Sequence, residues 1–234
     1  KSDKPLSLGE ITQFFDIDKS SIFRLLSTLT QNNFVYQDAE TKKYMLGFKI
    51  MELSGAFGEQ TKIETFLRPV LKAVCDKTRQ NTHLAILHGQ EVVFIAVEQP
   101  RNGISMHISV GTREPAHATA LGKVLIAFTQ KNEQELLLQG IVFTHYTPHT
   151  IVDGDEYRNH LSSIVQNRYA VDDEEYRLGV VCIAAPVFNH RGEVEYSIGI
   201  SGPKDQISPH IADYITVVQD AGAECSRLLG MSSR

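Results

Sequence analysis

The chain has 234 residues and a formal net charge of -5, and its 42% hydrophobic content is ordinary for a globular protein. This length allows one large or two modest domains. The sequence has no apolar run of about 18 residues and no charged-then-apolar leader, so we expect neither a membrane span nor a signal peptide. Its three cysteines form no CxxC pair, which argues against a zinc ribbon or a disulfide framework and favours a reducing cytoplasm.

Residues 6–34 predict two short helices separated by a tight turn. Ser7 and Glu10 form a capping box at the start of the first helix, and Asp18 is the expected N-cap of the second. The expected core positions of the two helices are Leu8, Ile11, Phe15, Ile22, Leu25, Leu26 and Leu29. Two such helices around a three-residue turn have helix-turn-helix spacing, which predicts contact with DNA.

The polar face of the second helix carries short hydroxyl groups around one arginine, where a solvated helix usually mixes glutamate and lysine. Such groups suit phosphates and base edges. The candidate DNA-binding residues of this helix are Lys19, Ser20, Ser21, Arg24, Ser27 and Thr28. The alternative is an ordinary polar surface helix. Residues 19–49 hold five basic and two acidic side chains, a local charge of +3 in an otherwise acidic chain, which favours nucleic acid.

A two-stranded hairpin is predicted next, from residues 34–36 and 44–46 joined by a charged loop. The hairpin would form a wing beside the helix-turn-helix. Lys42 and Lys43 at the end of the loop are candidates for phosphate contacts, and a solvated tip is the alternative. Gly47 ends the hairpin.

The remaining sequence predicts an α+β domain in which groups of strands alternate with helices. An apolar stripe with helical spacing runs from Ile63 to Val74, and Pro69 should kink or break this helix. Strands are expected at residues 82–87, 91–97, 104–110, 180–188 and 194–201. Helices are expected at residues 118–128, 133–138, 156–166 and 211–229.

Three motifs of the C-terminal part, together with the helix-turn-helix, carry a resemblance to a known family. The motifs are GTREPAHATALGK at residues 111–123, the stretch from Asp172 through Gly179 to Pro186, and residues 197–203. In this order and spacing they are similar to the IclR family of bacterial transcriptional regulators across nearly the whole chain. The family's first helix precedes the capping box, and this sequence has almost nothing there.

The resemblance implies a winged helix-turn-helix domain at residues 1–47, a helical linker at 48–78 and an effector-binding domain at 79–234. The last has a PAS/GAF-like α+β architecture, with an antiparallel sheet flanked by helices. Such a protein works as a homodimer or homotetramer in the cytoplasm. Its partners are double-stranded operator DNA and a small organic acid, and it needs no cofactor or metal.

In the acid-sensing branch of the family, the ligand pocket matches Met106, Ala120, Leu121, Asp172, Val180, Cys182, Gly199 and Ser201. A helix beginning near Thr119 would offer the free amides of Ala120 and Leu121 to a carboxylate. Asp172 would accept a hydrogen bond from a ligand hydroxyl. The branch has a second serine where this chain has Gly199, a change that removes a donor and is expected to leave room.

The expected function is therefore a ligand-responsive regulator, acting as a repressor of a catabolic operon, and not an enzyme. One alternative is an enzyme or metal site in which His117, Asp172 and Cys182 act together, with His83 or His107 as further metal ligands. No nucleophile-elbow or zincin motif supports it. A third reading is a DNA-binding module whose C-terminal domain only oligomerises.

Overall fold

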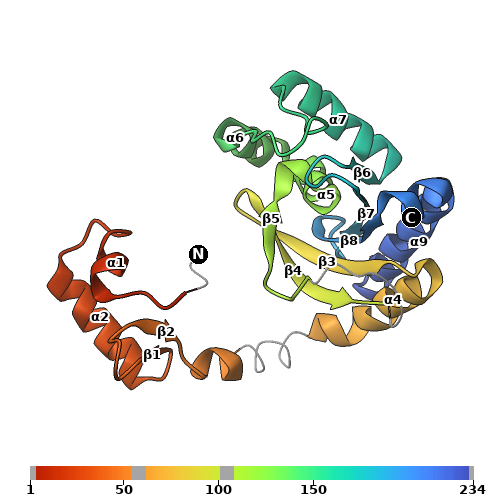
Figure 1. The fold of residues 1–234 in the computed structure, drawn as a ribbon. Helices are drawn as coiled ribbons and strands as arrows, with labels where there is room; N and C mark the ends of the chain where they lie inside the picture. The colour runs from red at the N-terminus through yellow and green to blue at the C-terminus, as the bar shows by residue number, and fades with distance from the viewer. Residues whose placement is uncertain (1–3, 54–61, 101–107, 232–234) are drawn as a thin grey trace. The chain divides into compact units, whose positions relative to one another are not determined.

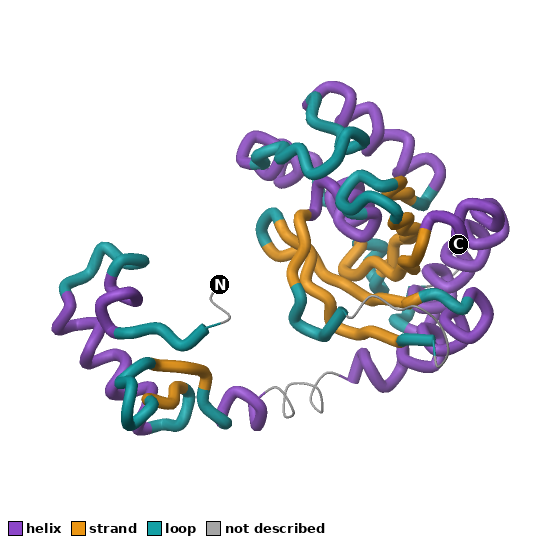
Figure 2. Tube along the Cα trace, viewed as in Figure 1, coloured by secondary structure: helices purple, strands orange, loops and turns teal. Residues whose placement is uncertain are grey.

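The structure, a computed structural model, describes residues 4–53, 62–100 and 108–231 (Figures 1 and 2). The chain forms two compact units, Lys1–Lys62 and Ile63–Arg234. Within the described ranges, no helix is long and apolar enough to cross a membrane.

The N-terminal unit contains α1 (Leu8–Thr12), α2 (Lys19–Gln31), β1 (Val35–Gln37) and β2 (Tyr44–Leu46), followed by a helical turn at residues 49–53. Both predicted caps are confirmed. The Glu10 amide donates to the Ser7 hydroxyl, while the Glu10 carboxylate accepts from the Ser7 amide at 2.7 Å. The Asp18 carboxylate accepts from the Ser21 amide at 3.0 Å. These side chains satisfy N–H groups that the first turn of a helix leaves free.

The hairpin of β1 and β2 confirms the predicted wing, with Tyr36 opposite Met45 in an antiparallel ladder. Its turn is closed by Asp38, whose carboxylate accepts from the amide of Thr41 at 2.7 Å. A small core formed by Ile22 and Leu26 of α2 and Tyr44 of β2 joins the helix to the hairpin.

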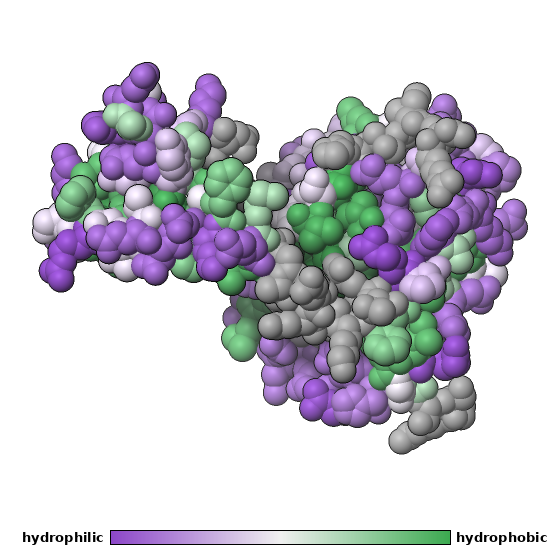
Figure 3. Space-filling model, turned by 90° about the horizontal axis from the view of Figure 1, so that it is seen from below, coloured by the Kyte–Doolittle hydropathy of each residue, from purple (hydrophilic) through white to green (hydrophobic). Residues whose placement is uncertain are grey.

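For three residues of this unit, the prediction that they lie in the core is wrong. Phe15 is 55% exposed, Leu25 56% and Leu29 39%. The first helix ends at Thr12, so Phe15 lies beyond the stripe that packs. Leu25 and Leu29 lie beside the buried stripe of α2, and no described element of the unit covers them. Figure 3 shows apolar residues between polar side chains on the visible face of this unit.

The second unit contains the strands β3 (Asn81–His88), β4 (Glu91–Glu98), β5 (Arg113–Pro115), β6 (Ala170–Asp173), β7 (Val180–Phe188) and β8 (Val194–Pro203). Its helices are α4 (Lys62–Thr78), η1 (Ala116–Ala118), α5 (Ala120–Phe128), α6 (Lys131–Gly140), α7 (Gly154–Asn167), α8 (Lys204–Ile207), η2 (Ser208–His210) and α9 (Ile211–Leu228). The strands form one antiparallel sheet in the order β5-β4-β3-β8-β7-β6. The predicted α+β class is confirmed.

Helices cover both faces of this sheet (Figure 1). On one face, Leu67 of α4 and Val218 of α9 pack in the same core as Ile198 of β8. On the other face, Val124 of α5 and Tyr157 of α7 pack in the same core as Ala184 of β7 and its neighbours. Residues of β3, β7 and β8 that point toward α5 line the pocket described below.

Three local predictions differ from the structure. The strand expected at 104–110 lies mostly outside the described residues, and its described end at residues 108–110 is not a strand. Instead, β5 forms the edge of the sheet by pairing with β4. The strand β6 was not expected, because its acidic residues are typical of a solvated loop. Pro69 lies inside α4 without breaking it, since burial of the apolar face of α4 offsets one lost hydrogen bond.

Candidate functional sites

The polar face of α2 presents two charged side chains, Lys19 and Arg24, together with short hydroxyl groups. Lys19, Ser20, Arg24 and Thr28 are exposed, and Ser21 and Ser27 are half-buried. Ser20 Oγ donates to Asp18 Oδ1 at 2.5 Å, and Thr28 Oγ1 donates to the Arg24 carbonyl oxygen at 3.1 Å. These hydroxyls can therefore only accept from a partner. Within the described part of the chain, the Arg24 guanidinium has no ion-pair or hydrogen-bond partner, so its donors are open.

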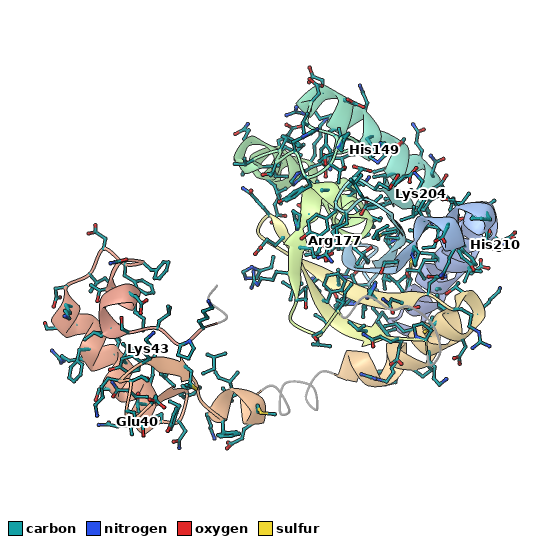
Figure 4. All side chains as sticks on the ribbon, in the orientation of Figure 1. Glu40, Lys43, His149, Arg177, Lys204 and His210 are labelled. Carbon is teal, nitrogen blue, oxygen red and sulfur yellow. The ribbon has the colours of Figure 1, made fainter. Side chains whose placement is uncertain are left out.

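The wing carries charges of both signs. Lys42 is exposed with a left-handed backbone φ of 56°, and Lys43 is half-buried. Asp38 and Glu40 lie in the same turn, and Figure 4 labels Glu40 and Lys43 on the hairpin. The acidic neighbours weaken the local positive potential, so the wing is suited to single phosphate contacts more than to a broad electrostatic footprint.

The C-terminal unit holds a small pocket on the α5 side of the sheet, partly open to solvent. Among the candidate effector residues, the pocket wall brings together Ala120, Leu121, Asp172, Val180, Cys182 and Ser201. Met106 lies outside the described residues. Gly199 does not line this pocket in the described structure.

The N-terminus of α5 forms one side of this pocket. Thr119 is the N-cap, and its hydroxyl accepts from the Gly122 amide at 3.4 Å. The amides of Ala120 and Leu121 belong to the first turn, whose N–H groups have no partner inside the helix. A Cβ at Gly122 would lie 2.2 Å from the Ala116 carbonyl oxygen. Only glycine therefore lets η1 approach the helix start this closely.

Asp172 lies on β6 opposite Cys182 and is only 2% exposed. Its Oδ1 accepts from the amides of Glu175 at 2.7 Å and Tyr176 at 3.3 Å, which fixes the carboxyl group beside the Cys182 thiol in the pocket wall. Burial raises the pKa of the Asp172 carboxyl to about 7, although the nearby Lys123 ammonium lowers it. This carboxyl group therefore changes protonation near neutral pH.

The geometry does not assemble the alternative enzyme or metal site. Burial raises the pKa of the Cys182 thiol well above its usual value, and the Asp172 charge adds to this effect. A thiol in this state is a poor nucleophile. His117 packs in η1, where its Nε2 lies 3.2 Å from the Thr144 carbonyl oxygen, and does not line the pocket. Among the described residues, no cluster of three His, Cys, Asp or Glu side chains could hold a metal ion.

Several residues of the pocket wall were not among the candidate effector residues, although His83 was named as a possible metal ligand. The polar ones are His83, Glu114, Thr119 and Arg177, and the apolar and aromatic ones are Phe94, Ile108, Tyr176 and Ile200. Arg177 Nη2 lies 3.2 Å from the Glu114 carboxylate, so a β5 residue and the turn after β6 meet in the wall (Figure 4). Glu114 and Arg177 stand inside the quoted motifs, but only the fold reveals that these motifs converge.

Gly199 is placed differently from the expectation that it adds room. It lies on β8 opposite His83 of β3 and Ala184 of β7. A Cβ at this position would lie 2.6 Å from the Ile183 carbonyl oxygen and 3.1 Å from the Ala184 Cβ. The missing side chain therefore permits close strand approach.

A winged helix-turn-helix unit joined to an α+β unit with a pocket is the architecture of a DNA-binding regulator with a sensor domain. Comparisons with known proteins agree. The family profile described as the IclR helix-turn-helix domain matches residues 1–39, and the one described as the bacterial transcriptional regulator IclR C-terminal domain matches residues 57–227. The chain belongs to the IclR family. It is a DNA-binding transcriptional regulator and not an enzyme.

Individual relatives cover nearly the whole chain. The HTH-type transcriptional regulator XynR of Escherichia coli K12 is 33% identical over 96% of this chain and 90% of its own length. The HTH-type transcriptional repressor AllR of the same strain is 26% identical over 100% of this chain and 86% of its own. The crystal structure of the Thermotoga maritima IclR has a TM-score of 0.75 and 27% identity, and the match covers 98% of this chain and 93% of that one.

Proposed function

We propose that this protein represses a catabolic operon and releases its operator when a small keto- or hydroxy-acid binds beside Asp172. The main support for the proposal is that the groups lining one pocket complement the parts of a small keto- or hydroxy-acid. The first-turn amides of α5 suit a carboxylate. The Oδ2 of Asp172 suits a ligand hydroxyl, and the apolar wall suits a short carbon chain.

The same proposal assigns DNA binding to the polar face of α2 and to the wing. Arg24 would contact base edges, and Lys42 and Lys43 would contact phosphates. The hydroxyl groups of the serines and Thr28 would accept hydrogen bonds from the DNA or position it. Repression is supported by the relative AllR, which is named a repressor. We further propose a homodimer or homotetramer acting in the cytoplasm, because paired copies would add their modest positive charges on DNA.

The test measures DNA release by the full chain. Promoter fragments of the genes beside its own gene are labelled, and fluorescence anisotropy follows binding while glyoxylate, pyruvate, glycolate or lactate is added. At least one acid should raise the dissociation constant for DNA in the wild type.

Two neighbouring aspartates provide a matched pair of variants. Asp172→Asn keeps the Oδ1 acceptor but replaces Oδ2 with a donor, so it should bind DNA normally and lose the response to the acid. Asp173→Asn changes the next residue, which is exposed and paired with Lys204 at 2.9 Å, and should respond like the wild type. An unchanged midpoint in Asp172→Asn would place the effector elsewhere. If no acid alters DNA binding or produces heat in calorimetry, the proposed effector class is wrong.

A further inference from the structure

One buried polar residue of the pocket wall is not used by the proposed carboxylate contacts. His83 of β3 is 2% exposed, and its Nε2 lies 2.7 Å from Ser201 Oγ. Its ring packs edge-on against Phe94, with ring centroids 5.1 Å apart. Its Nδ1 is buried and has no hydrogen-bond partner among the described residues. The imidazole therefore makes a single protein hydrogen bond, to a residue that faces the pocket.

The sheet register explains why His83 meets Ser201. In the antiparallel pair of β3 and β8, His83 lies opposite Gly199, and Ser201 lies opposite Asn81. Residues that differ by two positions in such a pair are diagonal neighbours on the same face. Gly199 offers no side chain, so Ser201 is the polar partner from β8 within reach of the ring.

The charge state of His83 restricts what the pair can do. Burial lowers the pKa of His83 to about 3, so the ring is neutral near pH 7 and carries one N–H. If Nε2 carries the proton, it donates to Ser201 Oγ and the unpartnered Nδ1 is an acceptor. In the other tautomer, the serine donates and an N–H is buried without a partner. Orphaned buried N–H groups are rarer than under-satisfied acceptors, which favours the first arrangement.

We propose that His83 is a positioning residue that determines effector specificity: its Nε2–H donates to Ser201 Oγ and turns the serine proton toward an acceptor oxygen of the effector. The inference rests on the proposed function, because it assumes that the effector occupies this pocket. A hydroxyl that already accepts a hydrogen bond is also a stronger donor. The serine thus selects ligands that offer a carboxylate, carbonyl or hydroxyl oxygen at this point.

Calorimetry on the full chain tests the proposal, with glyoxylate, pyruvate, glycolate and lactate as probes. His83→Phe keeps an aromatic ring but removes both nitrogens, and should weaken binding roughly three- to tenfold. His83→Gln restores an N–H donor and should recover affinity to within about threefold of the wild type. Circular dichroism and thermal unfolding confirm that each variant is folded.

A double-mutant cycle separates positioning from a merely structural role. In the Ser201→Ala background, His83→Phe should weaken binding by less than about twofold, because the group that His83 orients is gone. The same loss in both backgrounds, or no loss from His83→Phe in the wild-type background, would overturn the proposal.

A ligand-free measurement keeps the proposal separate from the identity of the effector. Long-range proton–nitrogen NMR spectra of the His83 ring should show the Nε2–H tautomer in the unliganded protein. If no acid binds the wild type, the proposed effector class is wrong. The NMR spectrum then tests by itself whether His83 carries its proton on Nε2. A predominant Nδ1–H tautomer would overturn the inference, and the Nε2–H tautomer would support it.

Discussion

The ammonium group of Lys123 on α5 forms an ion pair with the Glu175 carboxylate in the turn after β6, and both side chains are removed from solvent. The same ammonium donates to the Val171 carbonyl oxygen at 2.6 Å. The Glu175 amide in turn donates to Asp172 Oδ1. This chain of contacts ties the helix on one side of the pocket to the strand on the other.

We predict that Lys123→Met destabilises the protein by about 3–5 kcal/mol, because it leaves the Glu175 charge buried without a partner. Urea unfolding followed by circular dichroism measures this loss. The double variant Lys123→Met, Glu175→Gln removes both charges and should recover most of it. A single variant as stable as the wild type would mean that the pair contributes nothing in solution.

The raised pKa of Asp172 predicts a specific pH dependence of stability. Its carboxyl group titrates at about 7 in the folded protein and at about 4 when unfolded. Between these values the folded state binds more protons, so the free energy of unfolding falls as pH rises from about 4 to 7. The full effect is on the order of 4 kcal/mol. Asp172→Asn should lack this fall.

The contribution of Asp172 is obtained by subtracting the free energy of unfolding of Asp172→Asn from that of the wild type at each pH. Burial lowers the pKa of His83 to about 3 and of His160 to about 4, which destabilises the folded state as pH falls below about 6.5. These opposing effects occur in both proteins and cancel in the difference. Parallel pH profiles for the wild type and Asp172→Asn would contradict the assignment, and Asp173→Asn serves as the exposed control.

Gly199→Ser should destabilise the protein instead of adding a donor to the pocket. The new Cβ would lie 2.6 Å from the Ile183 carbonyl oxygen, so strand β7 or β8 must shift, at a cost of about 1–3 kcal/mol. Thermal unfolding measures the change. Gly154→Ser is the matched control, since a Cβ there comes no closer than 3.6 Å to the Arg158 side chain. Equal melting temperatures for both variants would refute the crowding argument.

Local signals allowed much of the fold to be predicted. The capping residues Ser7 and Asp18 act within three positions of their partners, so sequence alone places them. Periodicity likewise predicted β7 and β8. Periodicity wrongly predicted that Leu25 and Leu29 are buried, because burial also requires another element that packs over them. It failed for β6, because Asp172 and its acidic neighbours follow a solvated pattern, while the sheet buries Asp172.

The pocket was predictable only through the family resemblance, and only in part. His83 and Ser201 are 118 positions apart, and their meeting depends on the register of β3 and β8. Glu114 and Arg177 are 63 positions apart and also meet in the pocket wall. No local pattern encodes such pairs. The prediction that Gly199 adds room to the pocket was wrong. A glycine is compatible with either extra space or close packing, and only the structure distinguishes the two.

The wing should contribute phosphate contacts and no sequence discrimination. Lys43→Ala is expected to reduce the slope of log K against log salt concentration by about one, with equal effects on specific and nonspecific DNA. Lys131→Ala makes the same charge change at an exposed position of α6 and should leave the slope unchanged. Equal slopes for Lys43→Ala and the wild type would remove the wing lysine from the DNA interface.

Arg24 should instead carry sequence discrimination, because it is an exposed side chain of α2 whose donors remain open within the described structure. A bidentate arginine contact with a base is worth about 1–3 kcal/mol of discrimination. Arg24→Ala should therefore weaken operator binding by this amount and nonspecific binding much less. Ser20→Ala should have a smaller effect, since Ser20 already donates to Asp18. Titrations with operator and scrambled DNA at one salt concentration measure both. An equal loss on the two DNAs would make Arg24 a phosphate contact, and no loss would exclude this face of α2 from recognition.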